Sequence, residues 1–181
     1  MYKFAAAATD ESIVFGAARP GYTHPQVKEW IEFMQIRGIK RVCCLLSAPQ
    51  LDRYSDLLDV YQQYFGSDSI CWAPIADFQV VDREILINQI LPFLSLADRQ
   101  SERVVVHCAG GVGRTGQILA AWLIARRGFS RKLAIATVKQ SGRNPDEAIV
   151  AAPFMGRNPW QVATEIRTLL DACNHFNSPD R

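Results

Sequence analysis

The stretch Val104-Val-Val-His-Cys-Ala-Gly-Gly-Val-Gly-Arg-Thr-Gly116 is the most informative part of this sequence. It opens with an apolar run typical of a buried strand and continues into a loop that holds three glycines. A strongly apolar segment, 117–127, follows and stops at Gly128, which predicts a helix. Glycines let backbone N–H groups converge without interference from a Cβ atom, so the stretch predicts a concave anion-binding loop between a strand and a helix.

Cys108 stands at the start of this loop, where the N–H groups and the partial positive charge of a helix N-terminus favour its reactive thiolate form. Arg114 is placed across the loop to grip two phosphate oxygens with its planar fork. Thr115 is placed to donate a hydrogen bond to the sulfur, which helps the sulfur to leave in a second step. We predict these three as catalytic residues. The predicted phosphate-binding residues are Ala109, Gly110, Gly111, Val112, Gly113 and Arg114.

A nucleotide-binding loop of the Walker type is excluded, because it needs Gly-Lys before Ser or Thr and this loop has Arg114 there and no lysine. The pattern HCxxGxGRTG, from His107 to Gly116, resembles the signature of the protein tyrosine phosphatase superfamily. The chain length and compact N-terminal half resemble its dual-specificity branch, and a weaker likeness runs from about Phe15 to about Ile149. The resemblance implies a phosphocysteine intermediate on Cys108 that water hydrolyses, with no metal or other cofactor.

The resemblance also implies a general acid, an Asp on a mobile loop roughly thirty residues before the cysteine. Asp77 lies in Ala73-Pro-Ile-Ala-Asp-Phe78, directly after a predicted strand, and this context resembles the acid loop of the family. Asp82 is the rival, and it also fits as the N-cap of a helix that begins near Arg83. We predict Asp77 as the acid.

Two further residues are candidates for supporting the loop. His107 ends the buried strand, and we expect it to hydrogen-bond to backbone and steady the loop rather than act as a base. Asn144 lies where related phosphatases carry an Arg and an Asn that brace the loop, but the order Arg143-Asn144-Pro145 departs from their usual Pro-Asn arrangement. The tetrapeptide Gly-Arg-Asn-Pro occurs at 142–145 and again at 156–159, and each copy fits a helix start. The N-cap interpretation of Asn144 is therefore favoured over the supporting one.

The chain has five cysteines without the paired spacing of a zinc site or a disulfide framework. Four of them are expected to be buried apolar residues: Cys43, Cys44, Cys71 and Cys173. An alternative is that Cys43 or Cys44, or less readily Cys71, acts as a redox partner of Cys108. Reduced thiols predict a cytoplasmic location. His24 and His175 have no partner cluster and receive no role.

The composition predicts one globular domain over residues 1–181, because 181 residues with 49% apolar content suffice for one core. The net charge of +2, with basic residues spread along the chain, indicates no nucleic-acid partner. The apolar run near the N-terminus is too short for a signal or membrane-spanning segment.

Apolar periodicity predicts strands that alternate with helices, hence an α/β fold with a mostly parallel sheet and helices on both faces. Pro92 predicts a kink or break, and Trp160 is expected on the apolar face of the last helix. The expected strands are 13–17, 41–47, 70–75 and 104–107. The expected helices are 27–36, 51–65, 85–97, 117–127, 133–139 and 160–176.

Three functions remain open. The first is a phosphatase of proteins, acting on phosphotyrosine and on phosphoserine or phosphothreonine, with phosphate, sulfate or vanadate as site anions. The second is a phosphatase of a phosphoinositide, an inositol phosphate or an RNA 5′-phosphate. The third is a phosphate-binding module without catalysis, which is disfavoured because both Cys108 and Arg114 are present.

Overall fold

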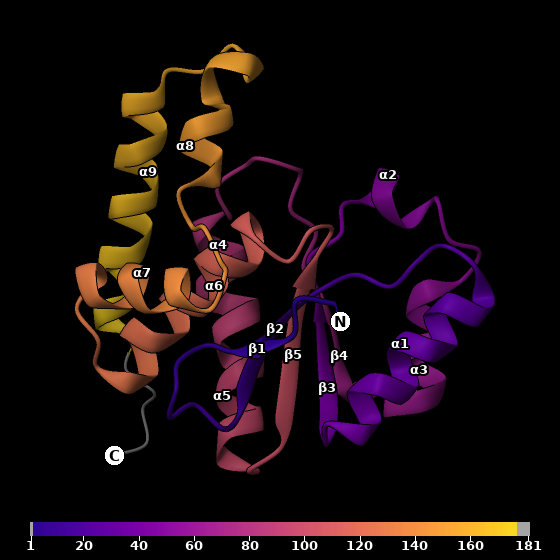
Figure 1. Cartoon of the computed structure of the whole chain (residues 1–181). Helices are drawn as coiled ribbons and strands as arrows, with labels where there is room; N and C mark the ends of the chain where they lie inside the picture. The colour runs from indigo at the N-terminus through magenta and orange to yellow at the C-terminus, as the bar shows by residue number, and fades with distance from the viewer. Residues whose placement is uncertain (1, 177–181) are drawn as a thin grey trace.

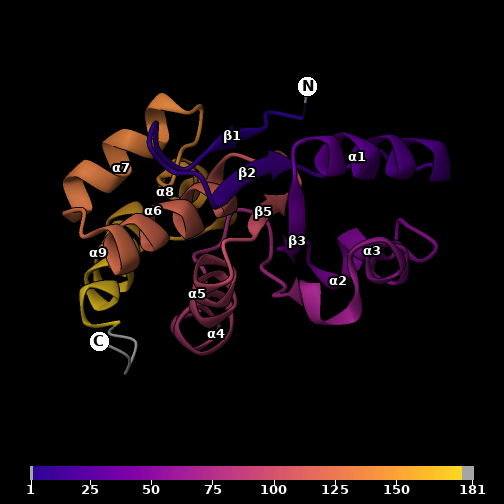
Figure 2. The same cartoon turned by 90° about the horizontal axis from the view of Figure 1, so that it is seen from below.

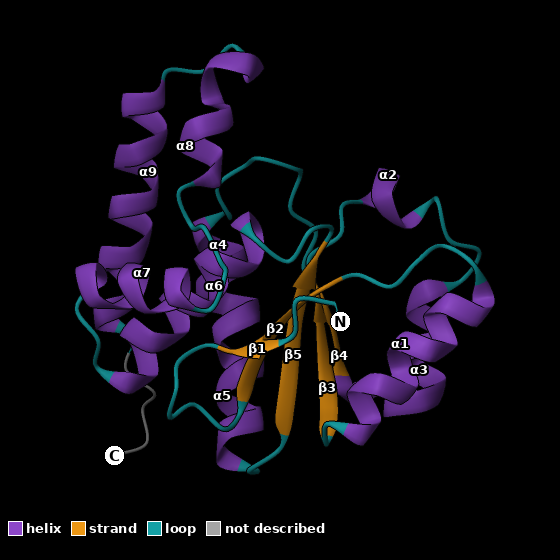
Figure 3. Ribbon diagram, viewed as in Figure 1, coloured by secondary structure: helices purple, strands orange, loops and turns teal. Residues whose placement is uncertain are grey.

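A five-stranded sheet forms the centre of the computed structural model, which describes residues 2–176 (Figures 1 and 3). The strand order is β1-β2-β5-β3-β4. β1 is antiparallel to β2, and all other neighbours are parallel. The mostly parallel α/β sheet expected from the sequence is confirmed. The strands are β1 (Ala5–Ala6), β2 (Val14–Ala18), β3 (Ile39–Cys44), β4 (Ile70–Trp72) and β5 (Arg103–Cys108).

Helices cover both faces of this sheet, with α1 and α3 on one side and α4 to α9 on the other (Figure 2). The helices of the first side are α1 (His24–Ile36), α2 (Ala48–Leu51) and α3 (Leu57–Phe65). Those of the second are α4 (Arg83–Ile85), α5 (Leu91–Arg99), α6 (Gly113–Arg127), α7 (Arg131–Gln140), α8 (Glu147–Ala151) and α9 (Pro159–Ala172). Short 3-10 turns lie at Ser67–Ser69, Ala152–Met155 and Cys173–His175.

Each face of the sheet has its own core. In β5, Val104, Val106 and Cys108 pack into the cluster of α5 and α6, whereas Val105 packs into the cluster of α1 and α3. This division follows from the alternation of side chains along a strand. The helix α6 lies against β5 and under α7 and α9, so it is buried almost all round, which explains its continuous apolar sequence.

Several expected elements differ in their bounds from the observed ones; the expected strand 70–75, for example, ends at Trp72. The expected helix 51–65 is two helices, because the chain turns at 52–56 and brings the Tyr54 side chain inward, where its hydroxyl donates to the Pro20 carbonyl at 2.9 Å. The expected strand 41–47 begins at Ile39 and ends at Cys44, because Ser47 starts α2 as its N-cap.

Near Pro92, where a kink or break was expected, the chain stays helical from Arg83 to Arg99 but changes its winding. A five-residue π turn, Leu86–Ile90, lies between α4 and α5, and Pro92, which has no N–H to donate, directly follows it in the first turn of α5. Asn158 caps α9 as expected, and its Oδ1 accepts from the Trp160 N–H at 2.9 Å. The expectation that Trp160 lies on the buried face of α9 is wrong, since 82% of it is exposed.

The C-terminal ends of the parallel strands meet at one edge of the sheet, and the loops that follow β5, β3 and β4 gather there (Figure 1). This edge is where open α/β sheets bind ligands. Within residues 2–176, no helix is both long enough and apolar enough to cross a membrane.

Candidate active site

The loop after β5 wraps around the sulfur of Cys108. The Gly111 N–H and the Thr115 hydroxyl each donate to Sγ at 3.2 Å, and Cys108 is 2% exposed. The helix α6 begins at Gly113, earlier than expected, so Thr115 lies in its first turn, where N–H groups have no acceptor inside the helix. Two donors and the N-terminus of α6 therefore face the sulfur.

Glycine is required at position 111. Gly111 has a φ of +67°, which residues with a Cβ atom rarely adopt. A Cβ atom there would lie 2.5 Å from the backbone carbonyl of Ala17 in β2. The predicted phosphate-binding residues 109–112 form the turn between β5 and α6, with the neighbouring strand packed directly against them.

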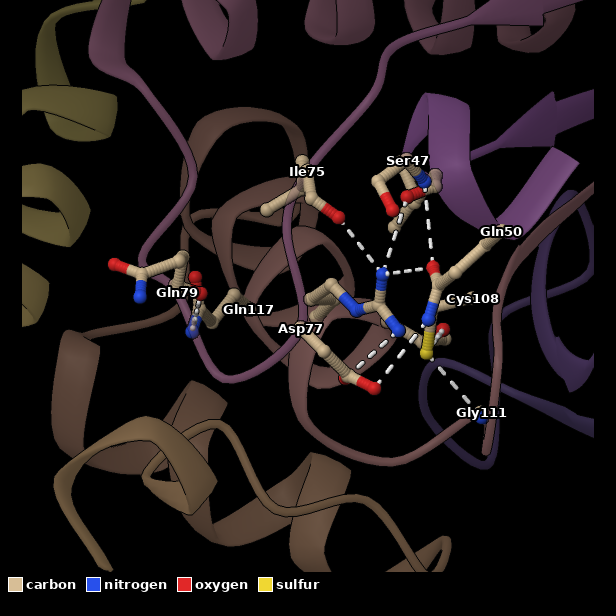
Figure 4. A network of polar contacts seen from close by, with 11 residues as sticks. Ser47, Gln50, Ile75, Asp77, Gln79, Cys108, Gly111 and Gln117 are labelled. Atoms are coloured by element: carbon tan, nitrogen blue, oxygen red, sulfur yellow. Dashed lines mark hydrogen bonds and ion pairs between the residues drawn. The ribbon is translucent and has the colours of Figure 1, made fainter. Parts of the chain in front are cut away.

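The guanidinium of Arg114 is 3% exposed and is held by groups from two other loops (Figure 4). Its Nη1 donates to the Gln50 Oε1 at 2.8 Å, to the Ile75 carbonyl at 2.7 Å and to the Leu45 carbonyl at 3.4 Å. Its Nη2 donates to the Asp77 Oδ1 at 2.8 Å. A nearly buried positive charge thus lies beside the cysteine loop, with one carboxylate as its ionic partner within the described residues.

The two candidate acids have different surroundings. Asp77 contacts Arg114 through Oδ1 and Gln50 through Oδ2, at 3.3 Å from Nε2, and its side chain is 46% exposed. Asp82 is the N-cap of α4, and its Oδ1 accepts from the N–H groups of Glu84 at 2.8 Å and Ile85 at 3.2 Å. Asp77 is therefore the carboxylate beside the cysteine loop, whereas Asp82 is engaged in capping a helix.

The segment that follows Asp77 is fastened to α6 by Gln117 (Figure 4). The buried Gln117 side chain accepts from the Val81 N–H at 3.0 Å and donates to the Gln79 carbonyl at 3.4 Å. Arg157 donates to the Gln79 side chain at 2.8 Å. Sequence reasoning passed over Gln50 and Gln117; a glutamine one residue after the loop motif, in an otherwise apolar helix, was a signal for Gln117.

His107 is fully buried and lies between aromatic rings. Its Nε2 lies 3.3 Å from the Tyr61 hydroxyl, and Nδ1 has no partner within residues 2–176. Its ring packs edge-on against Trp30 and Tyr61, with centroids 5.2 and 5.7 Å away. Burial lowers the pKa of His107 to about 3. The backbone of Cys108 partly opposes this shift, but burial outweighs it, so His107 is neutral at any pH near 7.

Arg143, not the Asn144 side chain, braces the loop. Its Nη1 donates to the Gly111 carbonyl at 2.5 Å, and its Nη2 donates to the carbonyls of Gly16 at 2.8 Å and Lys3 at 2.5 Å. Arg143 is 2% exposed, and burial lowers its pKa, while the nearby Cys108 opposes that shift. A second guanidinium therefore lies beneath the loop, close enough to Cys108 for the two groups to interact electrostatically.

The N-cap interpretation of Asn144 is wrong. The helix α8 begins at Glu147 with Asp146 as its N-cap, because Asn144 and Pro145 are used in the turn that approaches the loop. Asn144 contacts the loop through its backbone, with its N–H donating to the Val112 carbonyl at 3.3 Å. The motif Gly-Arg-Asn-Pro was the sequence signal for this segment, but the local pattern did not indicate that the arginine was its important member.

The other cysteines lie in the core, and all five are free thiols. Cys43 pairs in register with Val106 and with Cys71, so Cys43 lies two residues short of Cys108 along the sheet. Strand spacing places the Cα atoms of Cys43 and Cys108 about 8 Å apart, beyond ordinary disulfide reach. Cys44 points to the opposite core. A disulfide from Cys108 to Cys43 would therefore need backbone movement.

The model of the dual specificity phosphatase catalytic domain matches residues 27–155, well over half of the chain. The chain belongs to the dual specificity phosphatase family. Over 69 residues, this family member is 32% identical to the dual specificity protein phosphatase OPG106 of vaccinia virus (strain Western Reserve). That match spans 38% of this chain and 40% of the length of the viral protein.

Solved structures are similar over most of the chain. Tk-PTP in its active form has a TM-score of 0.66 and 25% identity, covering 87% of this chain and 93% of that one. PTPMT1 in complex with PI(5)P has a TM-score of 0.67 and 14% identity, covering 93% and 97%. At this identity the second likeness shows the fold alone. The family assignment rests on the matching domain model, and these structural likenesses do not decide the substrate.

Proposed function

We propose that this protein is a cysteine-dependent phosphomonoester hydrolase that acts on phosphotyrosine, and on phosphoserine or phosphothreonine, in proteins. The observation that carries the proposal is the grouping of three side chains at one loop. The Cys108 sulfur accepts from Gly111 and Thr115, and Arg114, at the end of the same loop, is in contact with Asp77. A nucleophile, an anion-binding cation and an acid thus meet at one point, as cysteine-based phosphoryl transfer requires.

In the first step, the Cys108 thiolate attacks phosphorus and forms an S–P bond while the bond to the leaving oxygen breaks. Asp77 in its acid form gives its proton to that oxygen, so the product leaves as a neutral alcohol or phenol. Backbone N–H groups of residues 109–113 and the fork of Arg114 stabilise the charge on the equatorial oxygens. For this step Arg114 exchanges its contact with Asp77 for contact with phosphate.

In the second step, water attacks the phosphocysteine and Asp77 takes a proton from it. The S–P bond breaks, inorganic phosphate forms, and the thiolate is regenerated. The Thr115 hydroxyl, 3.2 Å from the sulfur, stabilises the departing thiolate by its hydrogen bond. Neither step calls for a metal or a redox cofactor.

The charge of the loop supports a substrate with one phosphate at the site. The residues between Cys108 and Arg114 are Ala, Gly, Gly, Val and Gly, so Arg114 is the one cation of the loop. A headgroup with several phosphates needs further cations close by to offset its charge. Neutral loop residues therefore favour a phosphorylated side chain over a polyphosphorylated inositol. Five free thiols support a reducing compartment such as the cytoplasm.

Hydrolysis of para-nitrophenyl phosphate in EDTA tests the chemistry. We expect turnover that vanadate inhibits and that Cys108→Ser abolishes while phosphate binding, measured by calorimetry, is retained, because a serine hydroxyl ionises far less readily than a thiol. Activity of Cys108→Ser within tenfold of the wild-type protein would refute the mechanism. Absence of turnover in the wild-type protein, with phosphate still bound, would instead identify a binding module.

A panel of substrates tests the substrate class. Phosphotyrosine, phosphoserine and phosphothreonine peptides are compared with a monophosphorylated phosphoinositide in vesicles and with a 5′-phosphorylated RNA. We expect the highest kcat/KM on a phosphotyrosine peptide, and we expect Asp77→Ala to retain bound phosphopeptide because its leaving group is no longer protonated. A kcat/KM that is highest on the lipid or the RNA would overturn the assignment to proteins.

A further inference from the structure

Two arginines enclose one tyrosine ring beside the cysteine loop. The Cζ atoms of Arg19 and Arg53 lie 3.7 and 3.9 Å from the centroid of the Tyr22 ring. Two guanidinium groups cannot both stand that close to the centroid on one face, so they lie on opposite faces. Each is attracted by the ring quadrupole, which makes the three side chains a fixed stack.

The stack is attached to the cysteine loop at one end. The Arg19 N–H donates to the carbonyls of Cys108 at 3.0 Å and Ala109 at 3.3 Å. The Arg19 Nη1 donates to the Tyr54 hydroxyl at 3.0 Å and to the Pro20 carbonyl at 2.8 Å. The stack therefore joins the β2–α1 connection to the α2–α3 connection, at the edge of the sheet where the loop lies (Figure 1).

The positive charge of the stack is not offset by an ion pair. Within residues 2–176, neither Arg19 nor Arg53 forms a salt bridge with a carboxylate, and nearby Asp56 lies instead against His24 at 3.9 Å. Arg53 is exposed, and Arg19 and Tyr22 are half-buried. The two guanidinium groups are held on opposite faces of one ring and repel each other. An anion that binds at the edges of both groups reduces this repulsion and is therefore favoured.

We propose that Arg19, Tyr22 and Arg53 form a subsite for an acidic side chain of the substrate, an Asp or Glu within two residues of the phosphorylated tyrosine. The proposal rests on the proposed action on proteins. An extended peptide advances about 3.3 Å per residue, so an acidic side chain one or two positions away reaches over the rim next to the loop. A guanidinium fork matches a carboxylate with two parallel hydrogen bonds.

The position of the stack favours a peptide over a phosphoinositide. On an inositol ring a second phosphate is held rigidly near the scissile one, and residues 109–113 supply no cation for it within the loop. The stack lies outside the loop on separate connections, which suits a group joined to the scissile phosphate through a length of backbone.

The test compares two phosphotyrosine peptides that differ only by Glu or Gln at the two positions on each side of the tyrosine. Each is assayed for kcat/KM at low and at high salt, with the wild-type protein, Arg53→Gln and Arg37→Gln. Arg37 is the matched control, because it is also stacked on a ring, that of Phe33 at 5.0 Å, but lies at the start of β3, at the far edge of the sheet. Each substitution removes one charge from the surface.

We expect the wild-type protein and Arg37→Gln to prefer the acidic peptide by about three- to fivefold through a lower KM, as for a rim charge, with the preference weakened by salt. Arg53→Gln should reduce the ratio to below twofold. Peptide hydrolysis without any acidic preference, or an equal loss in Arg37→Gln, would overturn the subsite alone. Hydrolysis of para-nitrophenyl phosphate and of the vesicle-borne lipid, but of neither peptide, would overturn both the subsite and the proposed protein substrate.

Discussion

The ion pair between Asp77 and Arg114 predicts that removing one charge will strengthen anion binding while it weakens catalysis. Arg114 Nη2 donates to the Asp77 Oδ1 at 2.8 Å, so an incoming phosphate competes with this carboxylate for the guanidinium. In Asp77→Asn the side chain keeps its shape and loses its charge. Inorganic phosphate should then bind more tightly, although the variant has lost the proposed acid.

The size of the effect follows from the exposure of the pair. Arg114 is 3% exposed, but the Asp77 side chain is 46% exposed, so solvent screens the interaction and it is worth about 1 kcal/mol, the upper end for an exposed ion pair. That free energy corresponds to about fivefold in a dissociation constant. The expected result is therefore about a fivefold lower inhibition constant for phosphate, together with a kcat that falls most on substrates with weakly acidic leaving groups.

Steady-state inhibition by phosphate at fixed pH and ionic strength measures the first quantity. A series of aryl phosphates whose leaving groups differ in pKa measures the second. Asp82→Asn is the control, because it removes the same charge from a residue that caps α4, and asparagine caps a helix as well as aspartate does. Unchanged or weaker phosphate binding in Asp77→Asn, or the same gain in Asp82→Asn, would refute the competition between Asp77 and phosphate.

Three further predictions test the surroundings of the loop. The pKa of His107 is about 3 in the folded protein and 6.5 when unperturbed, so between these values the unfolded chain binds more protons than the folded one. The contribution of His107 to the free energy of unfolding is therefore fully present above pH 6.5 and is lost as the pH falls toward 3. Between pH 8 and pH 5, the free energy of unfolding measured in urea should fall by about 2 kcal/mol more in the wild-type protein than in His107→Asn. Equal falls in the two proteins would contradict a neutral, buried His107 ring. Gly111→Ala should lower kcat/KM by more than about tenfold and reduce Tm, whereas Gly110→Ala, where a Cβ atom meets nothing within 4 Å, should leave Tm unchanged; an equal fall of Tm in the two variants would contradict the packing of the loop against β2. Arg143→Met leaves three backbone carbonyls without their hydrogen-bond donor and should lower the free energy of unfolding by about 3–5 kcal/mol. Arg143→Lys should lie between this variant and the wild-type protein. A loss below about 1 kcal/mol in Arg143→Met would show that the loop does not need Arg143 for its stability.

The cysteine loop could be predicted from the sequence because its contacts are local. The Gly111 N–H and the Thr115 hydroxyl reach the Cys108 sulfur across three and seven residues, so one contiguous stretch specifies them. The short apolar run of β5 and the long one of α6 likewise identified a buried strand and a buried helix. The α/β class followed from the same local periodicity.

Local pattern was misleading where a short segment makes a distant contact. The residues around Asn144 have the pattern of a helix start. In the structure, however, the Asn144 N–H donates to the Val112 carbonyl in the loop, and the helix begins later, at Glu147. Trp160 has the spacing of a buried residue, but it lies in the first turn of α9 and is 82% exposed.

The choice between Asp77 and Asp82 as the carboxylate near the loop also needed the tertiary structure. Both follow the same predicted strand, and only the path of the chain after β4 brings one of them to Arg114 while the other caps α4.

What the sequence by itself determined is therefore the family motif, the loop and the alternation of strands and helices. What only the tertiary structure decided is the set of groups that hold the loop and its arginine in place. Gln50 meets Arg114 across 64 residues, and Arg143 meets Gly111 across 32. Such partners leave no periodic trace, because the geometry that joins them is created by the packing of the strands and not by the spacing of residues along the chain.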